Sequence, residues 1–270
     1  MKKIIALAVA AVVAAPAMAD LTIGGGAEYK LSLADGNASN SLETNLDVAA
    51  STTSEGGLTV SAFTQFEATG AGDASSALDI DDIFLNIGNG MATVTVSSVG
   101  GFANKDAFSL GADTAAQISG YGASSQERLM DTAITVTPVA GLTVQLAGSL
   151  SDAQDGYSVY AGYSAGGVSV AASMEDGGTD ATTGFGVSAS AALGEFTVGV
   201  DYAANDASQD MTVLKGAMGA ISLAYATDGT NDDIYGEYAA GEIAPGAALT
   251  LAAGSYESDS KVVAKLAYTF

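Results

Sequence analysis

From residue 20 onward, the chain consists of short runs in which apolar and polar residues alternate, with turn residues between them. In the clearest run, Leu21, Tyr29 and Leu33 share one parity, whereas Glu28 and Lys30 share the other. Successive side chains of a β-strand point to opposite faces, so this period of two predicts strands whose faces meet different surroundings. Sixteen such runs are present: 21–33, 42–50, 58–67, 82–88, 91–98, 131–137, 142–147, 157–163, 168–174, 185–193, 196–202, 211–218, 221–225, 234–240, 249–256 and 261–270.

The connections between these runs alternate in length and charge. Every second one is short and glycine-rich, as in 165–167, whereas those between them are mostly longer and hold twenty of the 31 acidic residues. A soluble β-sandwich has no general reason to separate its loops in this way, but an outer-membrane barrel has short periplasmic turns and longer extracellular loops. We therefore expect an all-β fold, a transmembrane antiparallel β-barrel of sixteen strands. Fourteen is the alternative count, because 211–218 and 234–240 are the weakest runs.

The last ten residues, KVVAKLAYTF, show the same alternation at the end of the chain. Phe270, Tyr268 and Leu266 share the apolar parity, whereas Lys261 and Lys265 share the other. A charge that faces lipid near the bilayer midplane costs about 2–4 kcal/mol, so we expect the apolar parity to face lipid and the lysines to face the lumen.

The first nineteen residues have the features of a secretory signal peptide. Lys2 and Lys3 precede an apolar stretch, 4–15, and the triplet Ala17-Met18-Ala19 precedes Asp20. The apolar stretch is shorter than the about 20 residues that a membrane-spanning helix needs. We expect cleavage after Ala19, export, and a mature domain of residues 20–270. That domain has six Lys and Arg against 31 Asp and Glu, a net charge of −25.

Composition excludes several classes of function. The chain has no Cys and no His, which excludes disulfides, Ser-His-Asp and Cys-His centres, and the commonest metal ligand. The negative charge repels nucleic acid. Gly24-Gly25-Gly26 lies within a run and is not followed by a helix, so it indicates close backbone contact instead of a phosphate loop. The spacing of Asp79, Asp81 and Asp82 favours a solvated acidic loop over a divalent-cation site. We expect no enzyme activity and no cofactor, with a divalent cation at the acidic outer loops as the open alternative.

Three segments resemble the general bacterial porins: Tyr268-Thr269-Phe270, residues 82–94 and residues 127–134. The resemblance implies a sixteen-stranded, trimeric, water-filled channel in the outer membrane of a Gram-negative bacterium, in contact with lipid and lipopolysaccharide. It implies passive diffusion of small hydrophilic solutes and cations. It also implies that Phe270, with Tyr268, is a signal for the barrel-assembly machinery.

The resemblance further implies that the third loop, 99–130, folds into the lumen and forms a constriction. Its expected residues are Asp106, Asp113, Glu127, Arg128, Lys30, Lys105, Lys261 and Lys265. On the inward parity, Glu28, Glu43, Asp47, Glu67, Asp201 and Glu237 add negative charge, so we expect a preference for cations.

Two other hypotheses remain open at this point. A channel specialised for one nutrient would show saturable flux. An exported adhesin or surface protein with a soluble β-fold would be soluble without detergent.

Overall fold

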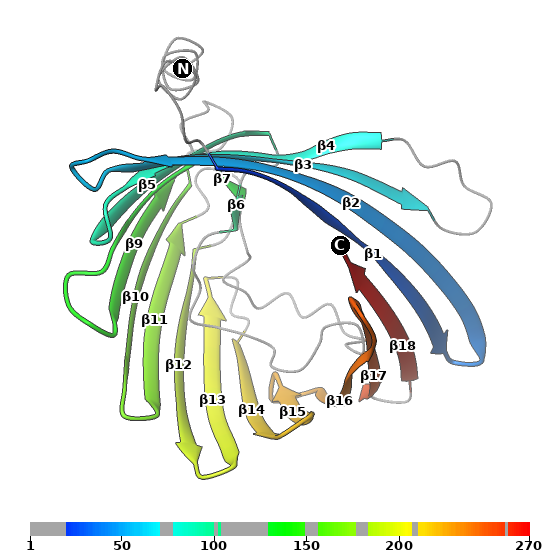
Figure 1. The fold of residues 1–270 in the computed structure, drawn as a ribbon. Coiled ribbons are helices and arrows are strands. Elements are labelled where there is room, and N and C mark those ends of the chain that lie inside the picture. Colours follow the sequence, from blue (N-terminus) through cyan, green and yellow to red (C-terminus); the bar gives the residue numbers. More distant parts are fainter. Residues whose placement is uncertain are drawn as a thin grey trace.

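The computed structural model describes residues 20–70, 78–99, 102–103, 129–148, 156–176, 183–206, 210–256 and 259–270. Within these residues the chain forms β-strands joined by turns (Figure 1). The strands are β1 Asp20–Ala34, β2 Asn37–Thr53, β3 Thr59–Gly70, β4 Leu78–Gly88, β5 Ala92–Val99, β6 Phe102–Ala103, β7 Leu129–Met130, β8 Thr132–Val136, β9 Leu142–Gly148, β10 Tyr157–Ala165, β11 Val168–Asp176, β12 Gly184–Leu193, β13 Phe196–Asn205, β14 Asp210–Met218, β15 Ile221–Thr227, β16 Asp232–Ala244, β17 Ala247–Tyr256 and β18 Asp259–Thr269. None of the described segments is a helix long and apolar enough to cross a membrane.

Sixteen of these strands form one closed antiparallel barrel, which confirms the expected fold class and strand count. Each strand of the barrel pairs with the barrel strands before and after it in the chain, so that β5 pairs with β8, and β1 pairs with β18 to close the ring. Figure 1 shows this closure, with the red β18 beside the blue β1. The remaining strands, β6 and β7, form a separate two-stranded sheet within the expected third loop. The sequence pattern did not predict this small sheet.

The seam between β1 and β18 depends on a glycine. Phe270 donates its N–H to the Gly25 carbonyl oxygen at 3.1 Å, and Gly25 donates its N–H to the Phe270 carbonyl oxygen at 3.3 Å. A Cβ atom on Gly25 would lie 3.0 Å from the Phe270 ring and closer still to the Asn45 carbonyl oxygen. The close backbone contact predicted for the triple glycine is therefore confirmed.

The first connection corrects one sequence-based expectation. The segment 34–40 was expected to be one of the longer acidic loops, but β1 and β2 continue to a two-residue turn, Asp35-Gly36. Both residues have positive φ, 49° and 80°, as in the tight hairpin turns that favour Asp-Gly. The Asp35 carboxylate accepts the N–H of Ser260 at 3.0 Å, so this turn also holds the start of β18.

The two faces of the barrel differ as the alternation predicted. On the outer face, apolar side chains such as Leu223 and Val262 are 59% and 54% exposed. On the inner face, Ser158, Gln145 and Asp201 are buried. One part of the inner wall, on β14 to β18, is apolar instead: its buried side chains are Met211, Val213, Ala224, Ala226, Tyr235, Ala252 and Val263.

Candidate channel wall

A lysine–glutamate cluster lies on the inner face at the seam of the barrel. Lys30 on β1 is directly opposite Lys265 on β18. Glu28 contacts both, with its carboxylate oxygens 3.1 Å from Lys30 Nζ and 3.8 Å from Lys265 Nζ. These side chains are 23–36% exposed, so solvent screens the ion pairs and each contributes little to stability. Their role is therefore better sought in the charge that they present to the lumen.

Lys261 shares the inward face of β18 with this cluster. It pairs with Ala34 and lies four residues before Lys265, about 13 Å away along the strand. The structure thus brings two of the predicted wall lysines, Lys30 and Lys265, together and places the third farther along the same wall.

A second ion pair lies on β13 and β14. Lys215 Nζ contacts the Asp201 carboxylate, whose side chain is only 2% exposed. Lys215 was not among the predicted wall lysines, and this contact shows that its side chain faces inward. Because Asp201 is almost fully buried, water stabilises its negative charge little. Asp201 therefore needs its lysine partner more than the exposed Glu28 needs Lys30.

Two inward acids were not predicted. Glu175 and Asp233 are 1% and 0% exposed and pair in register with Ser158 and Ala226 on the inner face. Both were expected to lie in loops, but β11 ends two residues after its expected end and β16 begins two residues before its expected start. Parity alone could have identified these acids as facing inward, because Glu175, for example, has the same parity as Ser173.

The other predicted constriction residues, Lys105, Asp106, Asp113, Glu127 and Arg128, lie outside the described residues.

The structure also corrects the expected position of the weak metal candidates. The segment 70–81 was expected to be a loop, but β4 begins at Leu78, so Asp79, Asp81 and Asp82 belong to a strand. The register shifts there, so that Gln65 pairs with Asp82 and Phe66 with Ile80. Across the described ranges, no three Asp or Glu residues gather as a metal site.

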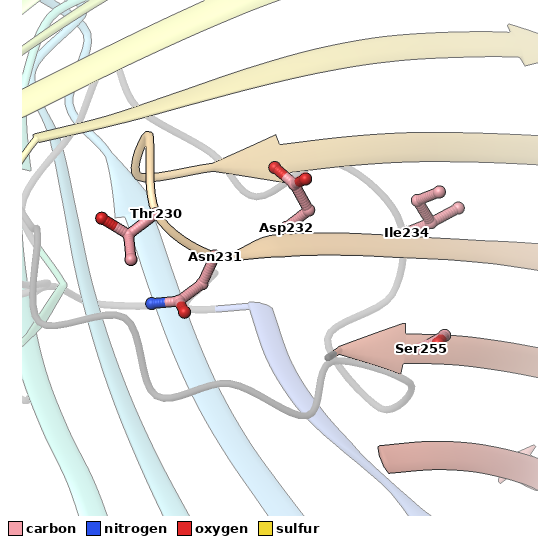
Figure 2. A pocket seen from close by; sticks show the side chains of 5 residues that line it. All are labelled: Thr230, Asn231, Asp232, Ile234 and Ser255. Atoms are coloured by element: carbon pink, nitrogen blue, oxygen red, sulfur yellow. The ribbon is translucent and has the colours of Figure 1, made fainter. Parts of the chain in front are cut away.

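The connection between β15 and β16 forms a notch at the rim of the barrel. A cavity of about 390 Å³ is lined by Thr230, Asn231, Asp232, Ile234 and Ser255 (Figure 2). Figure 2 shows these side chains on the connection and on the strands that follow it.

Asp228 organises this connection from within. Its carboxylate accepts the N–H groups of Asn231 at 2.7 Å and Thr230 at 2.8 Å, and these bonds lower the pKa of Asp228 below its usual value. The carboxylate of Asp232 accepts the Tyr225 hydroxyl at 2.7 Å. The backbone of the connection is thus hydrogen-bonded to its own Asp228, and the strands on either side of it are joined by Tyr225 and Asp232.

A closed antiparallel barrel with an apolar outer face and a charged inner face defines a transmembrane β-barrel channel. The chain belongs to the Gram-negative porin family, whose sequence profile matches residues 6–270. No curated protein sequence matches it.

Solved structures share the fold. Two double mutants of the Rhodopseudomonas blastica porin are each 16% identical over 93% of this chain and 100% of theirs, with TM-scores of 0.73 and 0.72. A triple mutant of the same porin is 17% identical over the same shares, with a TM-score of 0.71. At this identity the likeness is one of fold.

The family assignment decides among the sequence-based hypotheses. The protein is an outer-membrane channel for the passive diffusion of small solutes and is not an enzyme. The hypothesis of an exported adhesin with a soluble β-fold is wrong, because the chain is a porin that forms a closed transmembrane barrel.

Proposed function

We propose that this porin prefers cations and that short-range charge in its lumen sets the preference. The observation that supports it is the balance of charge on the described inner wall, where the acidic side chains outnumber the four lysines. The acids include Glu28, Glu43, Asp47, Glu67, Glu175, Asp201, Asp233 and Glu237, and the lysines are Lys30, Lys215, Lys261 and Lys265. A wall of one predominant sign raises the local concentration of the opposite ion.

The constriction is part of the same proposal. By resemblance, Asp106, Asp113 and Glu127 of the third loop stand against Lys30, Lys105, Arg128, Lys261 and Lys265. The Glu28–Lys30–Lys265 cluster supports this arrangement, because it already places two of these lysines at one position on the wall.

Neutralising the loop acids tests the constriction. We expect a channel with Asp106→Asn, Asp113→Asn and Glu127→Gln to shift toward anions in a salt gradient. Glu55→Gln with Glu195→Gln, in the short turns, is the matched control and should leave the reversal potential unchanged. An unchanged reversal potential in the triple variant would reject the constriction.

The route to the membrane completes the proposal. Cleavage after Ala19 would leave Asp20 as the first residue, which mass spectrometry of the membrane-inserted protein measures directly. We further propose a homotrimer, recognition of Phe270 and Tyr268 by the barrel-assembly machinery, and contact of the acidic outer loops with lipopolysaccharide through divalent cations. Chemical cross-linking of the native membrane tests the trimer, since a cross-linked ladder that stops at two chains would contradict it.

A further inference from the structure

The notch at the connection between β15 and β16 opens on the lipid-facing side of the barrel. Ile234, which lines it, is 60% exposed and pairs in register with Ser255, so both side chains lie on the outer face. Asp232 lies two residues before Ile234 and has the same outward parity, whereas the buried Asp233 between them faces the lumen. Figure 2 shows Asp232 and Ile234 on the same side of β16. The notch is therefore separate from the channel wall.

Tyr225 indicates the level of the notch relative to the membrane. It is the register partner of Ile234, and its hydroxyl donates to the Asp232 carboxylate at 2.7 Å. A tyrosine with an apolar ring and a hydrogen-bonded hydroxyl is typical of the membrane–water interface. Same-face positions along a strand repeat every two residues, so Ile234 lies about 7 Å farther from the rim than Asp232. The polar part of the notch thus lies at the level of lipid head groups, and its apolar part lies toward the bilayer core.

The hydrogen-bond donors of the connection are directed to Asp228. Its carboxylate accepts the N–H groups of Thr230 and Asn231, and it also accepts the Asn231 side-chain Nδ2 at 3.0 Å. The lining atoms outside these bonds are oxygens that can accept: Asn231 Oδ1, the hydroxyls of Thr230 and Ser255, and the Asp232 carboxylate. The notch therefore offers mainly acceptors to a ligand.

Two carboxylates make the notch negative. Asp232 is exposed, and the charge of Asp228 acts on it across the connection. Among the described residues that line the cavity, none is basic. A cation in the notch is therefore attracted by both carboxylates, whereas an anionic group is repelled by both.

A primary ammonium group matches this set of acceptors. It carries one positive charge and three N–H donors, and it has no acceptor. The cavity, at about 390 Å³, is large enough for such a head group, because small-molecule sites begin at about 300 Å³. We propose that the notch binds a lipid whose head group ends in a primary ammonium, with its chains along the exposed Ile234 and Leu223. The connection lies at the end opposite the short turn 219–220, so we assign the lipid to the outer leaflet.

Native mass spectrometry of the refolded full-length protein in a neutral detergent tests the site. Three lipids with identical acyl chains are titrated: phosphatidylethanolamine with a primary ammonium, phosphatidylcholine with a quaternary ammonium that lacks N–H donors, and anionic phosphatidylglycerol. The variant is Asp232→Asn, which keeps the size of the side chain and removes its charge. Asp210→Asn is the matched control, because Asp210 is also an exposed, outward acid at the first position of its strand on the same rim.

We expect the wild type to bind phosphatidylethanolamine about fivefold more tightly than phosphatidylcholine, a modest factor because the notch is open to solvent. In Asp232→Asn this difference should disappear, whereas Asp210→Asn should keep it. A chelator of divalent cations should leave the binding unchanged.

Four results would overturn the site. Equal affinity of the wild type for all three lipids would mean a non-specific lipid belt, and this comparison needs no variant. An equal loss in Asp210→Asn would mean a general effect of surface charge. Preferred binding of phosphatidylglycerol that the chelator abolishes would mean a cation-bridged phosphate. Displacement of phosphatidylethanolamine by an equal concentration of free ethanolamine would mean a soluble amine instead of a lipid.

Discussion

At Gly25 the absence of a side chain allows Phe270 to hydrogen-bond to the first strand. Gly25→Val would drive a branched side chain into the Asn45 carbonyl group and the Phe270 ring, so we expect a loss of about 1–3 kcal/mol, typical of overpacking. The free energy of unfolding in urea, measured on barrels refolded in lipid vesicles, gives the cost. Gly216→Ala is the control, because a Cβ there has no heavy atom within 4 Å. Equal stability of the two variants would contradict the tight seam.

The ion pair of Asp201 and Lys215 should matter more than that of Glu28 and Lys30. Lys215→Met leaves the buried Asp201 carboxylate without this partner. We expect destabilisation somewhat below the about 3–5 kcal/mol of a fully buried pair, since Lys215 is 25% exposed. Lys30→Met should cost no more than about 1 kcal/mol, because that pair is solvent-screened. The same unfolding measurement applies, and a larger effect at Lys30 would reverse this ranking.

The connection between β15 and β16 should lose its order in acid. The N–H groups of Asn231 and Thr230 lower the pKa of Asp228, so its carboxylate stabilises the folded connection fully above its unfolded value of 3.8. This contribution is lost as the pH falls below 3.8 through the lower folded pKa. Hydrogen exchange of the two amides, followed by NMR, should show protection at neutral pH that declines in that range. In Asp228→Ala protection should be low at every pH, and equal protection in both proteins would contradict the assignment.

We expect the last strand, β18, to have separable roles in assembly and in stability. Deleting Phe270 removes two backbone hydrogen bonds and a ring that lies 6.2 Å from the Tyr268 ring. In barrels already formed, this should cost a few kcal/mol, at about 1 kcal/mol per hydrogen bond plus the ring. In cells we expect a larger loss of outer-membrane protein. Phe270→Ala keeps the backbone bonds, so normal membrane levels of this variant would reject the ring as an assembly signal.

Strand identity and parity were predictable from the sequence because lipid and water impose opposite demands on alternate residues. Strand ends were not, because the strands continue past the bilayer, where no solvent contrast marks them; β2 and β16 are the clearest cases. The dipeptide Asp35-Gly36 is typical of a tight hairpin turn, but the general pattern of long acidic loops led to the prediction of a loop there. On β16, register shifts at Ala239/Gly241 and Glu242/Ala244 move the turn to 245–246, later than the alternation indicated.

Part of the wall was also predictable, and part was not. Lys30, Lys265 and Asp201 followed from parity, whereas the partnership of Lys215 with Asp201 depends on the register of β13 against β14. Phe63 and Phe84 are apolar residues at positions that have the polar, inward-facing parity of their strands. A prediction that follows the alternation strictly misses such exceptions.

At the scale of the whole molecule, the barrel combines a neutral, apolar belt with a strongly negative remainder. In the sequence, most acidic residues fall in the longer connections or on the inward parity of the strands, so we expect cations to be concentrated at the mouth and in the lumen. This field is screened beyond about 8–10 Å at ordinary ionic strength.

The reversal potential of single refolded channels in a potassium chloride gradient measures ion conduction and cation preference together. We predict discrete conductance steps, a reversal potential of the sign expected for potassium selectivity at low salt, and a decline of that preference as the salt concentration rises. Membranes that stay silent with correctly folded protein would contradict the water-filled channel, and a reversal potential of the opposite sign would contradict the cation preference.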